Sequence, residues 1–206
     1  MSPRGSSLQL VGLGGGASRT LIQNLNGTTP IDVGHDGRLL LLGQHQEAES
    51  FDPSTGKIQL LLPAGTNLPH AIAGLKWSTD QRSAAYLLRP SRESDHDAGV
   101  WETDFHRPPR QVFQGWVTDI ATAADGIYIL ESKPDLSTVL WKTGWSGQGA
   151  TRLTTALPLV ANFNYRHTHF LNQFAVSPDG KRVAFQSPVM QENIGTITLG
   201  PAGRNQ

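Results

Sequence analysis

The chain has 206 residues, of which 17 are basic and 17 acidic, with seven histidines and no cysteine. This charge balance, without a Lys/Arg-rich segment, argues against binding to nucleic acid or to an anionic membrane. The missing cysteine excludes disulfides, thiolate metal sites and cysteine nucleophiles. Residues 1–7 do not form a secretory signal, and no window approaches the ~18 apolar residues of a membrane span, so we expect one soluble domain.

The first patterned stretch, "LQLVGLGGGASRTLI" from Leu8, allows two hypotheses. Gly12-x-Gly14-x-x-Ala17 is close to a dinucleotide-binding fingerprint, and Asp32 follows Gly12 by 20 residues, near the position of a ribose-binding acid. Such a site needs a strand–helix–strand unit, and no helix-length amphipathic pattern alternates with strands downstream. We therefore interpret the stretch as a hairpin with a glycine-rich turn and predict no cofactor.

Four later stretches share one pattern of alternating strand, tight turn and second apolar strand. They are "IDVGHDGRLLLLG", "LKWSTDQRSAAYLL", "IATAADGIYILES" and "FAVSPDGKRVAFQS". Their turn aspartates are separated by 44, 45 and 54 residues, a period typical of four-stranded propeller blades. Aspartate accepts hydrogen bonds from turn amides and the following glycine tolerates a positive φ, so we interpret these residues as structural: Asp36, Gly37, Asp80, Asp125, Gly126, Asp179 and Gly180.

Each pattern is followed by a second pair of strand-like runs, cut short in the last copy. The prediction is an all-β propeller of four-stranded antiparallel blades forming a single domain, with about four to five blades and an incomplete or open ring. The predicted boundaries are a partial blade at 1–26, blades at about 27–68, 69–115 and 116–160, and a last blade with an insertion at 161–206. Open blade edges would favour self-association.

At "FAVSPDGKRVAFQSP" and "LQLVGLGGGASRTLI" the chain resembles the TolB-type propeller repeat, a relative of WD-repeat propellers. Ser177-Pro178-Asp179-Gly180 matches the family's turn fully, whereas the other three copies match in part. The resemblance implies a propeller fold far more specifically than a function. The last blade looks most like those linked to bacterial eukaryotic-like serine/threonine kinases, which implies a sensor or regulatory module. A periplasmic or extracytoplasmic location would follow only from an exported or membrane-anchored parent protein.

One group of candidate functional residues lies in loops between strands. His167 and His169 would share one face of an extended segment and are the candidate metal ligands, with His70 or His35 as a distant third. Loop residues that we predict to lie on the rim and to bind a protein, peptide or sugar are Arg92, Asp95, His96, Asp97, Tyr165 and Arg166.

Other motifs favour packing over chemistry. Trp101 and Trp141 occupy equivalent third-strand positions, which indicates interblade packing, whereas Trp77 and Trp116 are candidates for the central channel. Gly144-Trp145-Ser146-Gly147 resembles a nucleophile elbow but lacks its last glycine. No catalytic constellation emerges, so we predict a non-catalytic interaction module. The enzymatic alternatives are the propeller domain of a prolyl-oligopeptidase-like peptidase and a metal-dependent propeller lyase.

Overall fold

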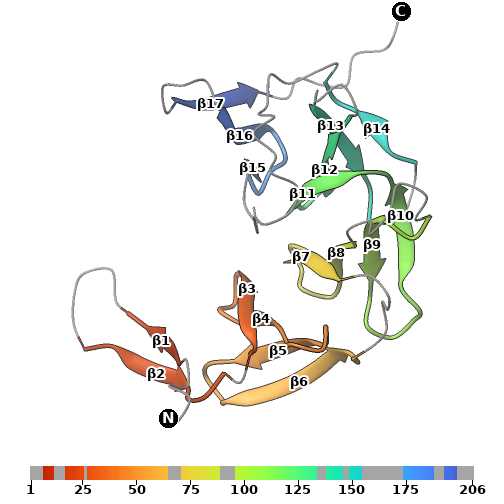
Figure 1. Ribbon diagram of the computed structural model, residues 1–206. Helices are drawn as coiled ribbons and strands as arrows, with labels where there is room; N and C mark the ends of the chain where they lie inside the picture. The colour runs from red at the N-terminus through yellow and green to blue at the C-terminus, as the bar shows by residue number, and fades with distance from the viewer. Residues whose placement is uncertain are drawn as a thin grey trace, which may run out of the picture. The chain divides into compact units, whose positions relative to one another are not determined.

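The computed structural model describes residues 7–11, 17–25, 27–64, 71–88, 96–133, 138–145, 149–154, 174–187 and 193–198. Within these ranges all regular structure is β-strand (Figure 1). No helix there is long and apolar enough to cross a membrane. The chain divides into two compact units, Met1–Leu68 and Pro69–Gln206, which are described separately.

The first unit contains a two-stranded antiparallel sheet and a four-stranded sheet of order β3-β4-β5-β6. The hairpin predicted from Leu8 is β1 paired with β2. Strand bounds in this unit are β1 (Leu8–Leu10), β2 (Arg19–Ile22), β3 (Thr29–Val33), β4 (Leu39–Leu42), β5 (Ala48–Asp52) and β6 (Lys57–Leu62).

The second unit contains two four-stranded antiparallel sheets, and a third sheet with three strands among the described residues. The first is β7 (Ile72–Trp77), β8 (Ala84–Leu88), β9 (Gly99–Thr103) and β10 (Arg110–Gln114). The second is β11 (Val117–Ala123), β12 (Gly126–Ser132), β13 (Thr138–Thr143) and β14 (Thr151–Arg152). The third is β15 (Phe174–Val176), β16 (Arg182–Ser187) and β17 (Asn193–Thr198). Because successive strands pair in chain order, each sheet has the meander of a propeller blade, and the predicted all-β fold class is confirmed.

Hydrophobic packing in the first unit joins its two sheets. Leu39, Leu41 and Phe51 are buried on the four-stranded sheet, and Leu8, Leu21 and Ile22 of the β1–β2 hairpin pack against them. Leu39 pairs with Phe51 across β4 and β5, so both side chains share one face. The hairpin therefore covers the centre of this face.

Two apolar seams hold neighbouring sheets of the second unit together. Ala85, Leu87 and Val100 of the β7–β10 sheet pack with Ile120, Ile127 and Ile129 of the β11–β14 sheet. Tyr128, Leu130 and Leu140, on the other face of β11–β14, pack with Phe174 and Val183 of the β15–β17 sheet. Side chains alternate along β12, so odd-numbered residues pack against the β7–β10 sheet and even-numbered residues against the β15–β17 sheet. This explains why the whole strand is buried.

Polar contacts supplement both seams. The Thr122 hydroxyl donates to the Trp77 carbonyl oxygen at 2.7 Å. Asp119 is buried, and its Oδ2 accepts a 3.4 Å hydrogen bond from the Phe174 amide, where β15 begins. Burying a carboxylate without hydrogen-bond partners costs free energy, so sheet arrangements that break the Asp119–Phe174 contact are disfavoured.

Three of the four turn aspartates accept local backbone hydrogen bonds. Asp36, Asp80 and Asp179 each accept one from the amide two residues on, at 2.9, 3.1 and 3.1 Å. In two of these turns a serine hydroxyl also donates to the aspartate: Ser78 to Asp80 and Ser177 to Asp179. These serine hydrogen bonds are the largest cause that lowers the pKa of Asp80 and of Asp179.

The turn between β5 and β6 contains a fifth such aspartate. Asp52 accepts hydrogen bonds from the Ser54 amide, the Ser54 hydroxyl and the Thr55 hydroxyl, at 2.8, 2.6 and 2.8 Å. These contacts, the Ser54 hydroxyl foremost, lower the pKa of Asp52 to about 2. The ionised carboxylate therefore stabilises this hairpin.

Stability is expected to fall as the pH drops from 4 to 2. A carboxyl whose pKa is lower in the folded state stabilises the fold above its unfolded pKa, and this contribution disappears as the pH falls through the folded pKa. Asp52→Asn should be less stable than the parent at pH 7, and the difference should shrink steadily as the pH falls from 4 to 2. Denaturant unfolding followed by circular dichroism from pH 7 to 2 measures this. A constant stability difference at all pH values would contradict it.

Candidate functional site

The strands of the second unit meet at two ends that carry different polar groups. At one end β8, β10 and β12 finish while β9, β11 and β13 begin. Eight described residues gather around this end, which we call the rim cluster: His96, Asp97, Gln111, Gln114, Trp116, Glu131, Lys133 and Trp141.

Three side chains of β9 and β10 fix residues 96–98, which lead into β9. Gln111 Nε2 donates to the carbonyl oxygens of His96 and Ala98 at 3.0 and 3.1 Å, and Trp101 Nε1 donates to the Asp97 carbonyl oxygen at 2.9 Å. Gln114 Nε2 lies 3.2 Å from His96 Nδ1. The backbone of residues 96–98 is held in this way, and the exposed side chains of His96 and Asp97 project from it.

The other half of the rim cluster is built around Glu131, which is only 8% exposed. Its Oε2 accepts a hydrogen bond from Trp141 Nε1 at 2.7 Å and forms an ion pair with Lys133 Nζ at 2.6 Å. Lys133 Nζ also lies 5.8 Å from the Trp141 ring centroid, within range of a cation–π contact. The buried acid is thus paired, and the half-buried Trp141 and Lys133 remain partly open to solvent.

Gly115 connects the two halves of the rim cluster. A Cβ at this position would lie 3.0 Å from Glu131 Oε1 and 3.0 Å from the Phe113 ring, so Gly115 packs closely against both. Phe113 in turn contacts Trp141, with 5.6 Å between ring centroids. The rim cluster therefore places imidazole, carboxylate, ammonium and aromatic groups at the same end of two neighbouring sheets, an arrangement suited to binding polar ligands.

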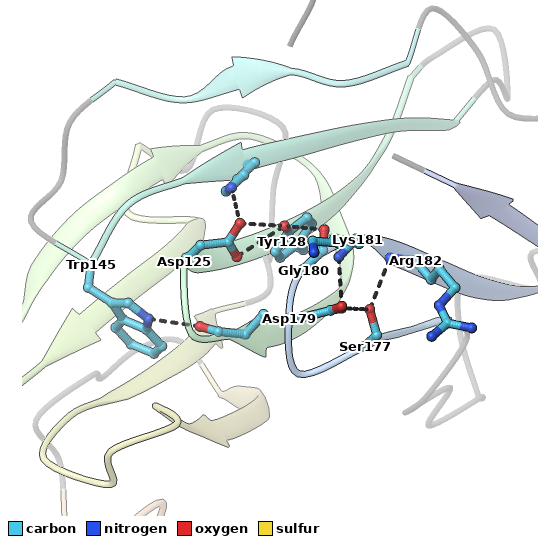
Figure 2. Close-up of polar contacts among 10 residues, drawn as sticks. Asp125, Tyr128, Trp145, Ser177, Asp179, Gly180, Lys181 and Arg182 are labelled. Carbon is cyan, nitrogen blue, oxygen red and sulfur yellow. Dashed lines mark hydrogen bonds and ion pairs between the residues drawn. The ribbon is translucent and has the colours of Figure 1, made fainter. Parts of the chain in front are cut away.

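The opposite end of the same strands carries a polar node around Asp125, shown in Figure 2. The Tyr128 hydroxyl has one proton, which it can donate to the Gly180 carbonyl oxygen at 3.0 Å or to Asp125 Oδ1 at 3.1 Å. Lys142 forms an ion pair with Asp125, and Trp145 Nε1 donates to the Ala123 carbonyl oxygen at 3.3 Å. Burial, followed by the charge of Asp125, raises the pKa of Tyr128, so the hydroxyl stays protonated and donating.

These contacts make the Asp125 node a structural connection. It joins the β11–β12 turn to the Ser177–Arg182 turn of the next sheet, and the Ala124 amide donates to the Pro178 carbonyl oxygen at 3.3 Å. Asp125 therefore differs from the other turn aspartates, because its carboxylate contacts Tyr128 and Lys142.

Several predicted site residues lie outside the described residues: Arg92, Asp95, Tyr165, Arg166, His167, His169 and His70. Among the described residues no group of three His, Cys, Asp or Glu side chains is placed to hold a metal ion. The described candidates His96 and Asp97 lie in the rim cluster, whereas His35 is exposed in the β3–β4 turn of the first unit.

The tryptophans divide between packing and the rim. Trp141 contacts Phe113 of the preceding sheet, and Trp101 stacks on Tyr86 of its own sheet at 6.5 Å between ring centroids. Trp77 is buried and makes an edge contact with Phe105. Trp116 is half-buried beside the rim.

Comparison with solved structures identifies the architecture. TolB from Acinetobacter baumannii superposes with a TM-score of 0.62 at 14% sequence identity, covering 94% of this chain and 46% of TolB. The putative TolB from Agrobacterium tumefaciens gives 0.61 at 14% identity, covering 88% and 62%. An oligogalacturonate lyase in complex with manganese gives a TM-score of 0.69 at 10% sequence identity, covering 95% of this chain and 57% of the lyase. The chain is structurally similar to TolB-like β-propellers.

This similarity concerns the fold alone, because sequence identity is low. The chain spans 46–62% of the length of these three propellers. No protein-family model matches the sequence, and no curated protein matches it either. The TolB-like propeller fold therefore supplies a scaffold, and function must be argued from the residues placed on it.

Sequence reasoning missed Glu131, Lys133 and Asp119 as members of polar clusters. Glu131 and Trp141 are diagonal neighbours, because Trp141 pairs with Ile129, two residues before Glu131 on the same face of β12. The available signal was an acidic residue, Glu131, two residues after the strand partner of Trp141. This signal can be used only when the pairing register of β12 and β13 is known.

Proposed function

We propose that this chain is a non-catalytic propeller scaffold that binds a protein or peptide at the rim cluster, as the sensor or regulatory part of a larger bacterial protein. The supporting observation is the fixation of residues 96–98 by Gln111, Gln114 and Trp101. A loop backbone that is held before binding loses little conformational entropy when a partner arrives, which favours affinity.

The composition of the rim cluster supports a polar partner segment. Asp97 offers a carboxylate, His96 an imidazole and Lys133 an ammonium group, while Trp141 and Trp116 supply aromatic surface. Aromatic residues surrounded by polar groups are typical of protein recognition sites. The proposed link to a serine/threonine kinase rests on the sequence resemblance of the last blade, and binding at the rim does not depend on it.

The enzymatic alternative is a metal-dependent lyase. It is favoured by one observation, the similarity in fold to an oligogalacturonate lyase whose structure contains manganese. The candidate ligands His167 and His169 decide between the two functions. Stoichiometric metal in protein purified without a tag, lost in the His167→Ala/His169→Ala variant, would support the lyase and contradict our proposal.

The rim is tested with peptides selected from a random dodecapeptide display library on the immobilised full chain. We expect the binding of selected peptides, measured by fluorescence anisotropy, to weaken about tenfold or more in His96→Ala/Asp97→Ala, because central interface residues commonly carry that much affinity. The matched control is His106→Ala/Arg107→Ala, two exposed residues at the opposite end of the same sheet. Peptides that bind all three proteins equally would contradict the proposed site.

A further inference from the structure

Among the described residues, β6 forms the outer edge of the first unit's four-stranded sheet and pairs with β5 on one side only (Figure 1). Ile58 lies opposite Phe51 and Gln59 opposite Ser50 in a regular antiparallel register. An edge strand directs alternate N–H and C=O groups outward, where they can pair with another strand. The backbone of β6 is thus chemically ready for strand addition.

The side chains of β6 do not protect this edge. Residues 57–60 are all exposed, and Ile58 and Leu60, on one face of the strand, are 54% and 56% exposed. Natural edge strands are commonly short or charged. β14 follows this rule with two exposed residues, Thr151 and Arg152, whereas β6 has six residues and a single charge, Lys57.

We propose that β6 pairs antiparallel with β6 of a second copy of the chain, about a two-fold axis at Gln59. This register places Ile58 opposite Leu60 of the second copy, and Leu60 opposite its Ile58. Since directly opposed residues share a face, the four apolar side chains merge into one patch. The interface is isologous and closes at the dimer.

The charge of the strand determines the orientation. In the antiparallel pair the two copies of Lys57 lie at opposite ends, four residues or about 13 Å apart along the strand. A parallel in-register pair would bring the two ammonium groups together, which is destabilising. The antiparallel pair therefore matches the apolar residues of the two copies and keeps their like charges apart, which is why we assign a second copy as the occupant.

This inference is independent of rim binding, because β6 belongs to the first unit and the rim cluster to the second. The experiment is sedimentation equilibrium of the full chain from 5 to 300 µM, with a monomer mass of 22.3 kDa. We expect a reversible monomer–dimer equilibrium. Hydrogen exchange of the outward-facing β6 amides should slow as the dimer forms.

The disrupting variant is Ile58→Thr/Leu60→Thr, since threonine keeps strand propensity while removing apolar surface. We expect its dimer dissociation constant to rise at least tenfold. The matched control is Leu10→Thr/Val11→Thr, which changes two similarly exposed apolar residues, at 56% and 60%, elsewhere in the same unit. Circular dichroism verifies that both variants are folded.

Three results would overturn the inference. The first is a parent protein that remains monomeric at 300 µM. The second is a dimer that the Ile58→Thr/Leu60→Thr variant leaves unchanged or that the control weakens equally. The third is protection of β6 amides by added apolar peptides without any self-association, which would assign the edge to a foreign strand.

Discussion

Gly126→Ala is expected to destabilise the second unit by about 3 kcal/mol, the upper part of the range for single substitutions. Gly126 opens β12 with a φ of +147°, a conformation that L-residues rarely adopt. A Cβ there would lie 2.3 Å from the Thr143 carbonyl oxygen on β13. Because this obstacle is backbone in a paired strand, relief requires a shift of the β12–β13 pairing, which lies between both apolar seams.

Tryptophan fluorescence measures this effect selectively. All five tryptophans lie between residues 77 and 145, so their emission in a denaturant titration follows the second unit alone. Gly149→Ala is the matched control, because a Cβ there meets nothing within 4 Å, and we expect no loss. Gly37 has a φ of +83° and open space around it, so Gly37→Ala tests the backbone strain without a steric clash. We expect this variant to lose about 1 kcal/mol of unfolding free energy, measured by circular dichroism. Equal effects in all three variants would contradict the steric explanation.

The strands and their hairpins could be predicted from the sequence, because each short alternating run is bounded by turn residues within a few positions. The hairpin predicted from Leu8 is present as the paired strands β1 and β2, whereas the glycines of its predicted turn lie outside the described residues. The prediction depended on local alternation and turn chemistry, which do not require knowledge of distant partners.

The distinct role of Asp125 could not be predicted from the four matching turns. Ala123 pairs with Gly126, so only two residues connect β11 to β12, whereas Ser177 and Arg182 enclose a longer turn. The shorter turn leaves Asp125 beside Tyr128 and Lys142. A difference in turn length changes the direction of the carboxylate, although the Asp-Gly pair itself is unchanged.

The rim cluster and the β6 edge show the same limit. Glu131 meets Trp141 only because of the β12–β13 register, which the pattern of either strand alone does not determine. The alternation of Ile58 and Leu60 predicts a strand with an apolar face, but burial depends on whether another layer covers that face. Sequence pattern therefore identified strands and loop candidates, while contacts between strands required the structure.

Tyr128→Ala is expected to destabilise the second unit by about 3 to 4 kcal/mol, as is typical when a large buried aromatic residue is truncated. The Tyr128 side chain is 1% exposed and belongs to the apolar seam with Leu140, Phe174 and Val183. Its hydroxyl reaches the Gly180 carbonyl oxygen on the neighbouring sheet. The substitution therefore removes both the apolar packing and the polar connection between the β11–β14 and β15–β17 sheets.

Tyr128→Phe separates the two contributions. It keeps the ring and removes only the hydroxyl, so we expect a loss of about 1 kcal/mol, the usual net value of one hydrogen bond. Tryptophan fluorescence gives the stability, and hydrogen exchange of the β15 amides reports whether the β15–β17 sheet opens on its own. In Tyr128→Ala these amides should exchange faster than those of β12. If Tyr128→Phe loses as much unfolding free energy as Tyr128→Ala, the hydroxyl dominates the contribution of Tyr128. If the β15 and β12 amides exchange at the same rate in Tyr128→Ala, the two sheets are coupled by contacts other than Tyr128.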